Sequence, residues 1–100
     1  MKGKIDIPRD KLGEFCRRHH ICKLGLFGSV LREDFGPDSD IDVLVEFEKG
    51  HEPGFAFFGM QEELSGLLGR KVDLNTPQFL SHYFRDKVLG EVKVQYEQTR

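Results

Sequence analysis

The feature that most constrains this chain is a pair of aspartates, Asp40 and Asp42, at the head of the apolar run Val43–Val45. The run has the composition of a buried strand, and successive side chains of a strand point to opposite faces. Asp40 and Asp42 therefore share one face, about 7 Å apart at the backbone, while Ile41 and the two valines share the other. The pattern predicts a sheet with carboxylates on one face and a core on the other. An isolated Asp-x-Asp is also common in surface turns, so the neighbouring sequence is needed to distinguish a metal-binding pair from a turn.

A phosphate-binding turn is predicted just upstream. Lys23–Phe27 has the composition of a short strand, Gly28-Ser29 that of a tight turn, and Val30–Phe35 that of one or two helical turns. A strand that turns sharply into a helix directs free backbone N–H groups outward, here together with the Ser29 hydroxyl, and so forms an anion site. A phosphate cradle beside two carboxylates is typical of a triphosphate site.

A third carboxylate lies later in the chain. Lys71–Asn75 is predicted to be a short strand with Asp73 on the face opposite Val72 and Leu74, ended by Thr76-Pro77. Close carboxylates repel one another unless a cation compensates, so a triad favours metal binding. Two Mg²⁺ ions roughly 3.5–4 Å apart are the usual device for in-line phosphoryl displacement. The alternative for Asp73 is an exposed aspartate at a strand edge.

Three segments carry a family resemblance: Gly28–Arg32 (GSVLR), Pro37–Val45 (PDSDIDVLV) and Val72–Leu74 (VDL). Together they resemble the signature of the nucleotidyltransferase superfamily that includes DNA polymerase beta. The chain length and the Gly-Ser…Ser-Asp-Ile-Asp form are similar to its smallest branch, the minimal nucleotidyltransferases (MNT) of bacteria and archaea. The resemblance implies the nucleotidyltransferase fold.

The resemblance also implies a nucleotide site. Gly28 and Ser29 would hold the β- and γ-phosphates of ATP, and Arg32 would be a further phosphate contact. For Arg32 the alternative is a solvated helix residue paired with Glu33 or Asp34.

The metal ligands implied by the resemblance are the three aspartates. Asp40 and Asp42 would ligate two Mg²⁺ ions. Asp73 would hold the ion nearest the acceptor and help to orient or deprotonate the incoming hydroxyl. All three are therefore the expected catalytic residues.

The implied reaction is transfer of a nucleoside monophosphate, AMP from ATP, to a hydroxyl with release of pyrophosphate. Many MNT proteins are antitoxins that add AMP units to a tyrosine of a HEPN-domain toxin, so a HEPN partner is expected. The alternative is a binding module that neutralises its partner by occlusion, without catalysis. A weaker option is transfer to a small molecule, with a homodimer interface supplying the part of the acceptor site that this chain lacks.

Length and composition limit the number of domains, the partners and the location that can be expected. One hundred residues fit a single minimal nucleotidyltransferase domain, residues 1–100, and leave no room for a large acceptor-binding domain, so the acceptor is expected on a partner protein. The net charge of −2 argues against direct nucleic-acid binding. The basic cluster Arg17–His20 ends a predicted helix, where cations complement the helix dipole. Without a membrane-spanning run or signal peptide, a cytoplasmic location is expected, and the length is compatible with a homodimer.

The rest of the chain is predicted to be scaffold. Helices are expected from Pro8 to about His20, after Pro53-Gly54 until Gly69, and after Pro77. Val92–Tyr96 alternates like an edge strand. These elements predict an α/β (α+β) fold with a mixed sheet and helices packed chiefly on one face.

Two groups of side chains remain. Phe55, Phe57 and Phe58 cannot all face one side of a helix, and a buried aromatic corner is favoured over an exposed surface that stacks on a base or docks a partner. The histidines do not predict zinc binding, because His19 and His20 are adjacent while His51 and His82 stand alone. Cys16 and Cys22 lack metal-site or redox-motif spacing.

Overall fold

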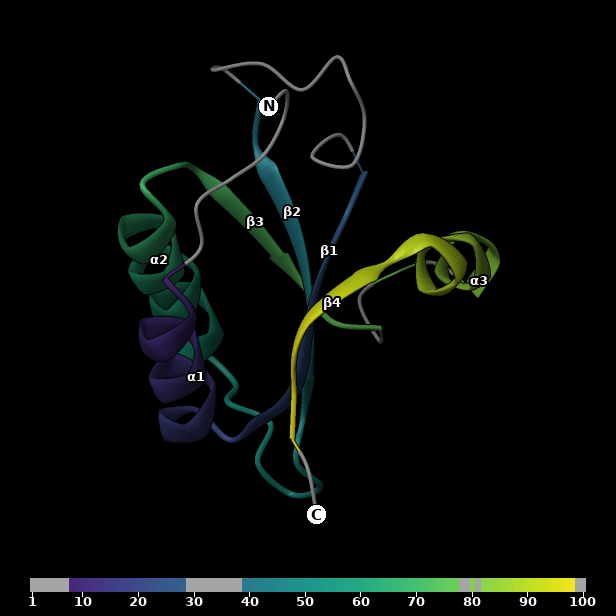
Figure 1. Cartoon of the computed structure of the whole chain (residues 1–100). Coiled ribbons are helices and arrows are strands. Elements are labelled where there is room, and N and C mark those ends of the chain that lie inside the picture. The colour runs from purple at the N-terminus through teal and green to yellow at the C-terminus, as the bar shows by residue number, and fades with distance from the viewer. Residues whose placement is uncertain (1–7, 29–38, 78–79, 81, 99–100) are drawn as a thin grey trace.

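The structure, a computed structural model, describes residues 8–28, 39–77, 80 and 82–98. Its elements are α1 (Arg9–Arg18), β1 (Ile21–Phe27), β2 (Ile41–Phe47), α2 (Ala56–Leu68), β3 (Val72–Asn75), α3 (His82–Glu91) and β4 (Lys93–Glu97). The four strands form one sheet in the order β3-β2-β1-β4 (Figure 1). The prediction of a mixed α+β sheet is confirmed.

The sheet is mixed because its connections differ. β1 pairs antiparallel with both β2 and β4, whereas β2 and β3 are parallel. Parallel neighbours need a crossover connection, and α2 supplies it. The β2–α2–β3 unit therefore brings the Asp42 strand next to the Asp73 strand.

The main core lies between the sheet and the helices α1 and α2, which cover the same face (Figure 1). Its buried side chains come from α1, α2 and three strands: Leu12, Phe15, Cys16, Ile21, Leu24, Leu26, Ile41, Val43, Val45, Phe57, Met60, Leu64, Val72 and Leu74. Burial raises the pKa of the Cys16 thiol to about 12. The apolar stripes of the sequence thus pack as predicted, and Cys16 behaves as a core residue.

A smaller core lies on the opposite face, where α3 packs. Phe27, Leu44, Leu80 and Val88 are buried there, with Val92 against them. Two helices on one face and one on the other agree with the prediction that helices pack chiefly on one face.

The helix ends follow local backbone chemistry. α1 stops at Arg18, two residues before the predicted end, because His20 adopts a left-handed φ of 59° and the chain then enters β1. α2 ends as predicted at Gly69, whose φ of 70° is the usual left-handed helix stop. β4 is an edge strand, as predicted. Among the described residues, no helix is long and apolar enough to span a membrane.

The prediction of a buried aromatic corner at the start of α2 is wrong. Phe57 is buried, but Phe55 is 93% exposed and Phe58 is 66% exposed. A helix turn can direct only one of these rings into the core, and Phe57 takes that position against Phe47.

The basic end of α1 makes a contact that charge counting alone does not show. Arg18 and His19 both bond the Glu63 carboxylate of α2, with His19 Nε2 at 3.0 Å from Oε1. The Arg18 hydrogen bond in particular lowers the pKa of Glu63. The two helices are thereby joined at the rim of the core.

This contact predicts a pH-dependent stability difference between the wild type and Glu63→Gln. The lowered pKa means that folding favours the carboxylate, so the stabilisation is present above the ordinary value of 4.5 and is lost as pH falls through the lowered pKa. We expect Glu63→Gln to cost up to about 1 kcal/mol at pH 7, because the group is partly exposed. Urea unfolding at pH 7 and pH 3 measures both differences, and an equal cost at the two values would contradict the ion pair.

Candidate active site

The strand register brings two of the predicted carboxylates together. Phe27 of β1 is paired with Asp42 of β2, and Asp42 is paired with Asp73 of β3. Directly paired residues on neighbouring strands lie about 4.8 Å apart and point to the same face. Asp42 is partly buried and Asp73 is exposed, on the face opposite the main core. The register therefore places these two carboxylates at neighbouring positions of the sheet.

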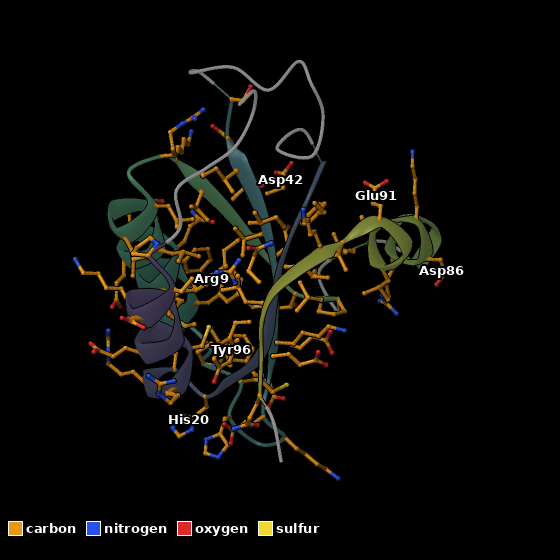
Figure 2. The ribbon with its side chains drawn as sticks, viewed as in Figure 1. Arg9, His20, Asp42, Asp86, Glu91 and Tyr96 are labelled. Carbon is orange, nitrogen blue, oxygen red and sulfur yellow. The ribbon has the colours of Figure 1, made fainter. Side chains whose placement is uncertain are left out.

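Asp40 precedes the first residue of β2 and is exposed. Two bonds fix the backbone around it: the Ile41 N–H donates to the Lys71 carbonyl at 2.9 Å, and Arg70 Nη2 donates to the Ser39 carbonyl at 3.0 Å. Both come from the segment that leads into β3. The approach to β3 therefore holds the residues on either side of Asp40, on the strand end where Asp42 lies (Figure 2).

Gly28 lies directly against Asp42. It follows β1 with a φ of 74°, and a Cβ at this position would overlap Asp42 Oδ2 and lie 3.3 Å from its Cγ. Only glycine satisfies both the left-handed backbone and the close approach of a carboxylate. The glycine predicted from the sequence to cradle phosphate thus also forms one wall around Asp42.

The edge strand β3 is secured by two polar side chains of α2. The Leu74 N–H donates to Gln61 Oε1 at 2.9 Å, and the Val72 N–H donates to Ser65 Oγ at 3.0 Å. Ser65 Oγ in turn donates to the Gln61 carbonyl. These N–H groups flank Asp73, so α2 fixes the backbone on both sides of that carboxylate.

Sequence reasoning missed this pair, because α2 was interpreted as core scaffold. The available signal was weak: Gln61 and Ser65 are spaced by four residues, each directly after a buried residue of the apolar stripe, Met60 and Leu64. The other two predicted nucleotide contacts, Ser29 and Arg32, lie outside the described residues and stay predictions.

The smaller core lies beside the carboxylates. Leu44 lies two residues after Asp42 on the same face, and Phe27 is the cross-strand partner of Asp42. Both pack with Leu80 and Val88 of the α3 region. The carboxylate face is therefore apolar on one side and open at the strand ends.

The donor set fits Mg²⁺. Carboxylate oxygens are the ligands that hard divalent cations prefer, and Mg²⁺ sites in phosphate chemistry use one or two carboxylates together with substrate phosphates. Asp42 and Asp73, paired across the strands with Gly28 packed against Asp42, supply two such carboxylates, and Asp40 lies two residues before Asp42 without a strand pairing to either. Such a face can hold cations and an anionic substrate over it.

Comparison with known proteins identifies the class to which this geometry belongs. The family model of the nucleotidyltransferase domain matches residues 9–94, and the chain belongs to that family. It is a nucleotidyltransferase enzyme, of the minimal branch whose members include the MntA proteins.

One relative is the protein adenylyltransferase MntA of Thermococcus cleftensis, which is 38% identical over 80 residues. The match covers 79% of this chain and 79% of the relative. The solved structure of a chain assigned to the minimal nucleotidyltransferases is 36% identical, with a TM-score of 0.70, over 84% of this chain and 85% of that one.

Two toxin–antitoxin structures share the fold at lower identity. One contains AMP-PNP, and a chain in it matches with a TM-score of 0.74 and 21% identity, over 93% of this chain and 76% of that one. The other is a tri-AMPylated Shewanella oneidensis HEPN toxin in complex with an MNT antitoxin, at a TM-score of 0.65 and 22% identity, over 90% of this chain and 70% of that one.

The Gly28 packing gives a first test of the site. Gly28→Ala and Gly69→Ala both place alanine at a φ near 70°, which costs about 1 kcal/mol. Gly69 has no atom within 4 Å of an added Cβ, whereas Gly28 meets Asp42. We expect Gly28→Ala to cost about 1 kcal/mol more than Gly69→Ala and to reduce nucleotidyl transfer strongly, while Gly69→Ala leaves transfer intact. Urea unfolding and a transfer assay measure this, and equal behaviour of the two variants would contradict it.

The edge clamp gives a second test. In the Gln61→Leu, Ser65→Ala double variant, two backbone N–H groups of β3 lose their partners, at a cost of about 1–3 kcal/mol for each fully buried group. We expect faster amide hydrogen exchange at Val72 and Leu74, and slower transfer because Asp73 is less well held. Glu62→Ala, an exposed change on the same helix, is the control. Unchanged exchange at both amides would show that the clamp does not hold β3.

Proposed function

We propose that this protein is an antitoxin that transfers AMP from ATP to a tyrosine hydroxyl of a HEPN-domain toxin. The observation that carries the proposal is the pairing of Asp42 with Asp73 across parallel strands, with Gly28 packed against Asp42. A relative that is 38% identical is named a protein adenylyltransferase, which supports AMP as the group and a protein as the acceptor. The AMPylated HEPN toxin in a structure of the same fold supports the partner.

Asp40, Asp42 and Asp73 would hold two Mg²⁺ ions between them. When bound, the ions neutralise the charge of the triphosphate and favour ionisation of the attacking hydroxyl. The partly buried position of Asp42 suits it to contribute to both metal positions, since it lies between Gly28, directly after β1, and Asp73 on β3.

The protein's other contributions are positional. Backbone N–H groups at Gly28 and Ser29, with Arg32, would orient the β- and γ-phosphates so that the α-phosphorus faces the open strand ends. The acceptor oxygen then forms a bond to this phosphorus while the bond to pyrophosphate breaks. Asp73 is exposed on the edge strand, where an acceptor can approach it, and it would orient the tyrosine hydroxyl and receive its proton.

The setting follows from the same proposal. A protein tyrosine as acceptor requires a HEPN partner in the same compartment, which we place in the cytoplasm. With a net charge of −2, this chain is not expected to bind nucleic acid by itself. A homodimer is compatible with the proposal but is not needed for it.

Intact-mass analysis of the partner tests this function. The chain is co-expressed with its proposed HEPN-domain partner, as wild type or with Asp40→Asn and Asp42→Asn. We expect a toxin mass increased by one or more AMP units only with the wild type, while both forms still bind the toxin. A loss of at least about a hundredfold in transfer rate is expected, because the ligands of the cations are removed.

The matched control is Asp10→Asn, which removes one carboxylate from the exposed face of α1, on the side of the sheet away from the triad. It should modify the toxin like the wild type. If the unmodified toxin is bound and neutralised equally by wild type and double variant, occlusion without catalysis is the correct function instead.

A further inference from the structure

A second cluster of metal-ligating side chains lies at the opposite end of the β1–β2 hairpin from the aspartates. His20, Glu48 and His51 each offer one ligand atom, and the three atoms lie within 4.8 Å of one another. The expectation that His51 stands alone is therefore wrong. The sequence separates His20 and His51 by 31 positions, but Ile21 pairs with Phe47, and this register brings the segments just outside the strands together.

The backbone presents His20 in an unusual way. His20 is the only residue other than glycine with a positive φ in the part of the chain that the structure describes, at 59°. Its carbonyl accepts the Glu48 N–H at 2.8 Å, which extends the β1–β2 ladder by one bond. Left-handed backbone is costly for a residue with a side chain, and such residues gather at functional positions. These features fix the backbone of His20, whose side chain lies at this end of the hairpin (Figure 2).

A tight turn places the other two ligands. His51 N–H donates to the Glu48 carbonyl at 2.9 Å, across a turn whose third residue is Gly50 with a φ of 85°. The turn puts both side chains beside His20. The His20 and His51 rings are stacked, with centroids 4.0 Å apart and an angle of 17° between their planes.

Glu48 also has a partner that orients it. Gln98 Nε2 donates to Glu48 Oε2 at 3.1 Å, while the Gln98 N–H donates to the Cys22 carbonyl at 2.7 Å. One carboxylate oxygen is thus held from a segment fixed on β1, and the other oxygen can serve as a ligand. Metal-binding carboxylates are commonly oriented by such outer hydrogen bonds.

We propose that His20, Glu48 and His51 form a Zn²⁺ site, separate from the carboxylate site. Two imidazoles and one carboxylate are a donor set that Zn²⁺ binds with a fourth position left to water. Mg²⁺, which the aspartates suit, prefers oxygen ligands, so the two sites differ in the ion they select. Glu48 lies six positions after Asp42, just past the end of β2, which in an extended strand is about 20 Å.

Metal binding would require these side chains to move. Ligand atoms around tetrahedral Zn²⁺ lie about 3.4 Å apart, so the three side chains need to close from within 4.8 Å. The stacked rings must also turn until both planes contain the ion. His20 and His51 are both exposed, so their side-chain torsions can change without displacing core residues. Binding would join the residue before β1 to the turn after β2.

Calorimetric titration of the tag-free, metal-stripped protein with Zn²⁺, in millimolar Mg²⁺ to occupy the aspartates, tests the site. We expect one Zn²⁺ per chain and a weakening of at least about tenfold for His51→Ala and for His20→Gly. Glycine tolerates the φ of 59°, so His20→Gly removes a ligand without a folding penalty at that position. Gln98→Ala, which removes only the orienting bond, should weaken binding less than loss of a ligand.

The matched control is His19→Gln. His19 is adjacent in sequence, but its ring contacts Glu63 and Phe15, so this variant should bind Zn²⁺ like the wild type. Retention of full affinity in both His20→Gly and His51→Ala would place any bound zinc elsewhere and overturn the proposal. Absence of Zn²⁺ binding by the wild type at micromolar concentrations would overturn it as well.

Discussion

The parallel pairing of β2 with β3 is the interaction on which the rest of this structure depends. It aligns Asp42 with Asp73 and, through the same register, aligns Ile41 with Val72 and Val43 with Leu74. The first alignment builds the carboxylate face, and the other two build the main core beneath it. A slip of one residue would direct the aspartates into the core and the aliphatic side chains into water. Burial of the aliphatic side chains in the core therefore fixes the β2–β3 register, and the same register fixes the positions of the carboxylates.

α2 makes this pairing possible in three ways. It is the crossover that parallel strands require, and Phe57, Met60 and Leu64 supply its share of the core. Gln61 and Ser65, on the flank of the same helix, accept the outward N–H groups of β3. An edge strand of only four residues has few ladder bonds of its own, so these side-chain acceptors matter more here than they would on a long strand. A single helix thus determines where Asp73 lies.

The sequence predicts the elements that depend on local pattern. An apolar run identified β2, alternation identified β3, Gly69 marked the end of α2, and the face that each aspartate takes within its own strand followed from strand parity. It could not predict contacts that depend on register between distant segments. The Gln61 and Ser65 bonds to β3, the Glu63 contact with Arg18, and the stacking of His20 on His51 all belong to this class. Phe55 and Phe58 were misjudged for a related reason: composition favours burial of aromatic rings, but helix geometry admits only Phe57.

The two ends of β2 carry different chemistry because the strand meets different neighbours there. At the Asp42 end, glycine at position 28 and the parallel strand leave carboxylates close together, a charge concentration that favours a hard cation and a polyphosphate. At the Glu48 end, the antiparallel partner strand β1 begins directly after α1. The short connection from α1 to β1 contains His20 and lies beside the turn at Gly50. Imidazoles gather only there among the described residues. A strand of seven residues keeps its two ends about 20 Å apart, so the Zn²⁺ proposed at the hairpin end would not compete for the carboxylates at the other end.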